Sequence, residues 1–199
     1  MLATLNEPLC TLKDHIAPKS TTLRAKHNTK GGFTFTKTSE GTGPGAPPPP
    51  ETLFTVSSRS SLSAPRRVIH NASSGKPFLE LWRNHVGDDS YIGVPNSAAL
   101  PLATVAPRPT KLKDKADVYV KNASRGGDEV KLEVRGQDVW KRNTCVYFGD
   151  EVVVQVRFVN YVTSYVPFAS NQWDVVVAEG FDLALVSEGL VLVSWYCGL

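Results

Sequence analysis

The sequence predicts a mainly β fold, a closed antiparallel β-barrel of about twelve strands around a central hydrophobic C-terminal helix. Two observations carry this prediction. Short apolar or alternating runs recur about every eight to twelve residues, and turn-forming residues separate them, as is typical of sandwiches and barrels. One long apolar segment, residues 181–197, follows the last of these runs. Because the side chains of the wall cannot fill a barrel of this size, we expect that segment to occupy its interior.

The expected strands follow from alternation and from the turns between them. The clearest is residues 129–135, where Val130, Leu132 and Val134 alternate with charged residues, as they do when one face of a strand is buried. The best hairpin signal is Gly149-Asp150, which joins two apolar runs. In chain order, the expected strands are 21–27, 32–37, 52–58, 66–71, 78–83, 90–94, 101–107, 116–122, 129–135, 144–148, 151–158 and 172–178.

The remaining segments have compositions that oppose regular structure. Residues 1–19 contain Pro8 and Pro18, and we expect an extended N-terminal lead-in there. Residues 20–199 are expected to form a single barrel domain, with a Gly/Pro-rich loop insertion at residues 40–50. The four consecutive prolines of that loop favour polyproline II, so a proline-binding partner is the alternative to a plain exposed loop.

The terminal apolar segment fits a buried helix, because its polar residues are few and fall on one narrow seam. Asp182 suits the N-cap position, and Gly198 follows the last turn. Two alternatives stay open. Residues 190–193 also suit a core strand. A C-terminal membrane tail anchor is the other, but the segment is shorter than the ~20 apolar residues of a span and contains Glu188, which is costly in hydrocarbon.

The cysteines and the net charge narrow the class of protein. Cys10, Cys145 and Cys197 show no C-x-x-C spacing, which argues against a disulfide framework or a zinc site and favours a reducing compartment. The sequence does not begin with a basic and apolar leader, so we expect a cytoplasmic protein whose contact with membranes, where it has one, is peripheral. The net charge of +3 is too small to indicate a nucleic-acid partner.

No catalytic pattern rises above background in the sequence. The four histidines are scattered, and neither a G-x-S-x-G nor a G-x-x-x-x-G-K-[ST] motif occurs. We therefore expect no enzymatic activity, no metal and no cofactor.

Basic clusters are the pattern with a functional interpretation. If the fold brings them together, they could hold a phosphorylated lipid head group through charge-assisted hydrogen bonds, whereas on separate faces they would be ordinary solubility charges. The candidate anion or lipid head-group contacts are Arg66, Arg67, Lys111, Lys113, Lys115, Lys141 and Arg142.

The order of several sequence units resembles that of the LURP-one-related proteins. The units are GGFTF at 31–35, LFTV at 53–56, Ser74-Gly75-Lys76-Pro77, the run at 149–156, and the ending WDVVVAEGFDLALVSEGLVLV at 173–193. The resemblance covers about residues 15–197. The linker at 47–50 is longer than usual for the family, and residues 84–115 are hard to align with it.

The resemblance implies the fold of the tubby C-terminal-like superfamily, a twelve-stranded barrel around a central C-terminal helix. Tubby proteins bind phosphoinositide head groups, the related scramblases act at membranes, and plant members of the family are linked to pathogen defence. The expected function is therefore a non-enzymatic intracellular binding module that engages phosphoinositide membrane lipid or a protein partner. The alternatives are a protein-interaction scaffold without lipid binding, using the proline-rich loop, or a tail-anchored membrane protein.

Overall fold

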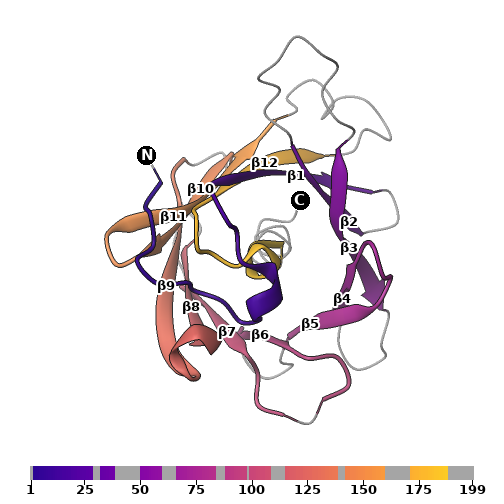
Figure 1. Ribbon diagram of the computed structural model, residues 1–199, viewed down its shortest axis with the longest axis horizontal. Helices are drawn as coiled ribbons and strands as arrows, with labels where there is room; N and C mark the ends of the chain where they lie inside the picture. Colours follow the sequence, from indigo (N-terminus) through magenta and orange to yellow (C-terminus); the bar gives the residue numbers. More distant parts are fainter. Residues whose placement is uncertain are drawn as a thin grey trace.

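The protein is a closed antiparallel barrel of twelve strands, in which β1 closes on β12 and every other strand pairs with its neighbours in sequence (Figure 1). The computed structural model describes residues 2–28, 32–38, 50–59, 66–83, 88–97, 99–108, 115–138, 142–159 and 171–187. The strands are β1 (Thr21–His27), β2 (Phe33–Lys37), β3 (Glu51–Arg59), β4 (Arg66–Asn71), β5 (Pro77–Arg83), β6 (Ser90–Gly93), β7 (Ala103–Arg108), β8 (Lys115–Asn122), β9 (Asp128–Gly136), β10 (Asn143–Phe148), β11 (Glu151–Phe158) and β12 (Gln172–Val177). The predicted mainly β class, the closed antiparallel barrel and its twelve strands are confirmed, whereas of the predicted central C-terminal helix the described residues contain only a short piece.

Alternation along the strands explains why this sequence closes into a barrel. In β9, Val130 and Leu132 are buried while Lys131 between them is exposed. In β1, Leu23 and Ala25 are fully buried, and the intervening residues face outward. The inward residues of the strands form one apolar core, in which the burial of each large side chain contributes about 1.5–3 kcal/mol. The largest fully buried side chains are Phe33, Phe35, Phe181, Leu23, Ile69, Leu79, Leu81, Ile92, Leu132, Val120 and Val153.

The up-and-down order gives the barrel two ends of different composition. Every odd-numbered strand begins at the end where Thr21 pairs with Val177, and every even-numbered strand begins at the other end, where Lys26 pairs with Gln172. We call the first the strap end and the second the basic end.

The strap end takes its name from residues 2–19, the strap, which cross it and contain the short 3-10 helix η1 (Lys13–His15) (Figure 1). Leu9 bridges Phe181 in parallel orientation, and Ile16 bridges Asp182 in antiparallel orientation. The Leu9 amide donates to the Gly180 carbonyl at 2.9 Å. The segment expected as an extended lead-in is therefore packed against the far end of the chain, and Leu9 is 2% exposed.

The chain turns inward after β12, and residues 183–187 form a helix inside the ring of strands (Figure 1). Asp182 is its N-cap, as predicted, because its Oδ1 accepts hydrogen bonds from the amides of Ala184 at 2.8 Å and Leu185 at 3.3 Å. The described helix is short and buried, and the remainder of the predicted helix, residues 188–197, lies outside the described residues. So do residues 40–49 of the predicted loop. Among the residues described, no helix is long and apolar enough to cross a membrane.

Candidate functional site

Four of the predicted head-group contacts lie at the same end of the barrel. Arg66 and Arg67 begin β4, Lys115 begins β8, and Arg142 directly precedes β10. Because even-numbered strands all begin at the basic end, the antiparallel order brings these residues to one end, although they are distributed around its rim. Lys111, Lys113 and Lys141 lie outside the described residues.

Arg66 and Arg67 face opposite sides of the barrel wall. Arg66 points outward, where its Nη1 lies 3.3 Å from the Glu80 carboxylate and its side chain is 44% exposed. Arg67 is two residues from the buried Ile69 on the same strand, so its side chain also faces inward. Its guanidinium lies 5.5 Å from the centre of the buried Phe33 ring. Burial lowers the pKa of Arg67 to about 10, so the group remains charged at neutral pH.

Lys115 and Arg142 are exposed on the rim. Lys115 pairs in register with Arg108 and with Arg135. These two arginines are already engaged by carboxylates of the outer wall, whereas Lys115 forms no ion pair with any described residue.

A network of five charged groups covers the outer wall beside Lys115. Arg108 contacts both Asp117 and Glu133, and Lys131 lies 3.4 Å from each of the same two carboxylates. Arg135 donates to Glu133 at 2.7 Å, with its guanidinium 4.4 Å from the Tyr147 ring centre. Hydrogen bonds from Arg135 and Lys131 hold the pKa of Glu133 below its usual range. The network contains three cations and two carboxylates, so it has a net charge of +1.

A second basic cluster was not predicted from the sequence. Arg24 and Lys26 on β1 and Arg157 on β11 flank Asp174 of the intervening strand β12. Arg24 binds Asp174 through Nε at 2.9 Å and Nη2 at 2.8 Å. Lys26 and Arg157 are exposed and form no ion pair within the described part of the chain. The sequence did not reveal this cluster because Arg157 lies far in sequence from Arg24 and Lys26, and each of the three alternates with less polar residues along its strand.

The strap end carries most of the exposed carboxylates of the described residues, although Asp88, which is paired with Arg83, is exposed at the basic end. Among the described residues, those at the strap end are Glu7, Asp14, Glu51, Asp128, Glu129, Asp150, Glu151 and Glu179. One described ion pair engages this set, between Glu7 and Arg125 at 2.7 Å. Several lysines lie at the same end, among them Lys13, Lys19 and Lys76, so this end is mixed in charge rather than uniformly acidic.

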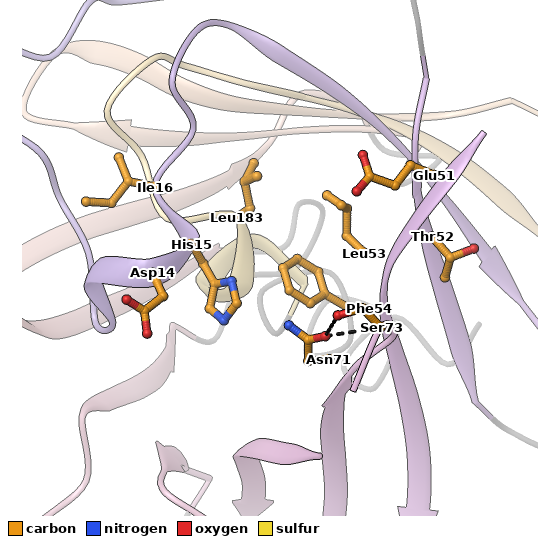
Figure 2. A pocket seen from close by; sticks show the side chains of 10 residues that line it. All are labelled: Asp14, His15, Ile16, Glu51, Thr52, Leu53, Phe54, Asn71, Ser73 and Leu183. Carbon is orange, nitrogen blue, oxygen red and sulfur yellow. Dashed lines mark hydrogen bonds between the residues drawn. The ribbon is translucent and has the colours of Figure 1, made fainter. Parts of the chain in front are cut away.

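A pocket of about 210 Å³ opens at the strap end between the strap and β3 (Figure 2). Its polar lining comprises Asp14, His15, Glu51, Thr52, Asn71 and Ser73, and its apolar lining comprises Ile16, Leu53, Phe54 and Leu183. The His15 ring meets the Phe54 ring edge-on, with 5.2 Å between centres, and lies 4.7 Å from the Phe78 ring. Within the described ranges, no three His, Cys, Asp or Glu side chains gather as a metal site would need.

Comparison with known proteins adds a family assignment to this geometry. The family model described as LURP-one-related matches residues 7–193, nearly the whole chain. A search of curated proteins finds no match.

Proposed function

The chain belongs to the LURP-one-related family, and on that premise we propose that it is a non-enzymatic intracellular binding module that docks its basic end on a membrane containing phosphoinositides. Membership of the family and the closed twelve-stranded barrel both fit a tubby-like binding module. The lipid ligand and the docking face are the parts of the proposal that go beyond the family.

The observation that carries the proposal is the convergence of exposed cations on one barrel end. Lys115 and Arg142 from the predicted set, and Lys26 and Arg157 from the second cluster, all lie in the half of the barrel nearest the basic end. Each Lys or Arg near an anionic leaflet contributes about 1 kcal/mol of attraction. That attraction fades over a Debye length of about 10 Å at 0.1 M salt, so only cations that approach the surface together add their contributions.

Their distribution around the rim favours a surface over a single soluble ligand. Lys26, Lys115 and Arg157 belong to three different strands, spread around the ring, and in the described part of the chain they do not line one small cavity. A flat array of lipid head groups meets all sides of a barrel end at once. Arg67 is left out of the proposed contact set, because its guanidinium lies inside the wall against Phe33.

Vesicle flotation at low salt tests the proposal. We expect the protein to float with phosphatidylcholine vesicles that contain a few per cent of phosphatidylinositol 4,5-bisphosphate, and not with phosphatidylcholine alone. The double substitution Lys26→Glu and Arg157→Glu should reduce partitioning by about 30-fold or more, since the loss of two cations alone removes about 2 kcal/mol.

The matched control reverses two lysines of the strap, Lys13→Glu and Lys19→Glu, which changes the net charge by the same amount. These side chains are exposed at the opposite end, so partitioning should change by less than about threefold. If both double variants lose the same amount of partitioning, net charge alone explains the binding and the basic end is not the docking face. If the wild-type protein binds neither type of vesicle, the proposed lipid binding is wrong.

A further inference from the structure

The pocket at the strap end has no part in the proposed membrane contact, because it opens at the other end of the barrel. Three segments that are distant in sequence build it: the strap, β3 with the β4–β5 turn, and the first residue of the inner helix (Figure 2). We propose that it binds a small organic ammonium ion, with an amino alcohol such as choline as the best-matched class.

The size of the pocket sets the size of the ligand. A volume of about 210 Å³ corresponds to about seven water molecules at ~30 Å³ each. Pockets for drug-sized molecules begin at about 300 Å³. A nucleotide or a lipid chain is therefore too large, whereas a molecule of about seven non-hydrogen atoms fits.

The charge of the residues at the rim of the pocket determines the sign of the ligand's charge. Asp14 and Glu51 line the pocket from the strap and from β3, and neither forms an ion pair with another described residue. No Lys or Arg is among the lining residues. Two carboxylates on one small rim, neither of them ion-paired within the described residues, attract a cation and repel an anion.

The interior favours an organic cation over a hydrated metal ion. Phe54 is 2% exposed and Leu183 is 9% exposed, so the back of the pocket is apolar and partly aromatic. His15 is held against Phe54 and Phe78 and completes that wall. Quaternary ammonium groups bind where an aromatic face and an anionic rim meet, since their charge is spread over methyl groups that need no hydrogen-bond acceptor.

Asn71 supplies the reason to prefer an amino alcohol. Its Oδ1 already accepts from Ser73 N at 3.0 Å, Ser73 Oγ at 2.7 Å and Ser74 N at 3.2 Å. These bonds fix the carboxamide so that its nitrogen is turned toward the His15 side of the pocket (Figure 2). That N–H group is a donor for the hydroxyl oxygen of a ligand whose ammonium end lies at the rim.

Nuclear magnetic resonance titration of the full chain tests the assignment, with choline chloride and its uncharged isostere 3,3-dimethylbutan-1-ol as the two probes. We expect choline to cause saturable shifts at His15, Phe54 and Leu183, and the isostere to bind about tenfold more weakly, because it lacks the charge. Equal affinities, or no saturable shift at these residues, would overturn the proposal.

Two substitutions distinguish binding in the pocket from nonspecific electrostatic attraction to the strap end. Glu51→Gln should weaken choline binding about threefold, the size expected for one exposed charge contact. Glu129→Gln removes another exposed carboxylate of the strap end, one that does not line the pocket, and should leave choline affinity unchanged. If both substitutions weaken binding equally, the pocket is not the site. Failure here leaves the flotation result untouched, since the two experiments probe opposite ends.

Discussion

The two ends of the barrel each hold an ionisable side chain in the wall or core, fully buried at one end and half-buried at the other, and they stabilise it in different ways. At the strap end, the fully buried Asp182 carboxylate accepts hydrogen bonds from the inner helix and from the strap. At the basic end, the half-buried Arg67 guanidinium lies against the Phe33 ring. The carboxylate is stabilised by several hydrogen-bond donors, whereas the guanidinium has an aromatic ring beside it. The buried carboxylate of the strap end therefore joins three parts of the chain, whereas the basic end is the face that we propose meets the membrane.

The largest expected effect is at Asp182. Besides capping the helix, its Oδ2 accepts from the Thr11 amide at 2.9 Å, from the Thr11 hydroxyl at 2.7 Å and from the Leu12 amide at 3.4 Å. Asp182→Ala removes the cap and leaves buried donors without an acceptor, so we expect a loss of about 3–5 kcal/mol in the free energy of unfolding, measured with urea.

Two further substitutions calibrate this loss. Thr11→Val removes only the hydroxyl bond and should cost about 1–2 kcal/mol, which remains measurable even if Asp182→Ala does not fold. Glu179→Ala changes an exposed acid near Asp182 in sequence and should stay within about 0.5 kcal/mol of wild type. A cost for Asp182→Ala no larger than that of Glu179→Ala would show that the strap does not hold the helix.

A smaller effect is expected at the basic end, where pH acts on His27. Burial, and then the nearby Arg67 charge, lower the pKa of His27 below 6.5, so the unfolded chain binds this proton more readily than the folded one. Stability should therefore fall as pH falls through and below 6.5. Urea unfolding at about pH 7.5 and about pH 5.5 measures that fall.

Substitutions of His27 and Arg67 test whether these two residues cause the loss of stability at low pH. His27→Gln should reduce it, because the titrating group is gone. Arg67→Met should reduce it less, because burial is the larger cause of the lowered pKa and only the repulsion is removed. An unchanged pH dependence in His27→Gln would mean that His27 contributes nothing to it.

The sequence predicted the barrel because strand and turn signals are local. Alternation such as that of Val130, Lys131 and Leu132 is visible within a few residues, and so is the capping role of Asp182. The contact between Asp182 and Thr11 was not visible, since the partners are 171 residues apart and an N-cap pattern says nothing about further donors. The packing of the strap against residues 180–182 was missed for the same reason.

The candidate site was predictable only in part. Strand parity could have separated Arg66 from Arg67, because residues two apart share a face and Ile69 is an inward residue. The cluster of Lys26 and Arg157 around Asp174 needed the register between β1, β12 and β11, which no single strand contains. The convergence of Lys115 and Arg142 likewise depends on the order of strands around the ring.

The claim that the basic end meets the membrane is tested most directly by nuclear magnetic resonance on nanodiscs that contain phosphatidylinositol 4,5-bisphosphate and a paramagnetic head-group label. Amides close to the label lose signal, so the measurement identifies the face of the barrel that touches lipid. The account predicts the strongest loss at Lys26, Lys115, Arg142 and Arg157, with the strap unaffected. Strongest loss at the strap, or at Glu129 and Glu151 beside it, would contradict the account.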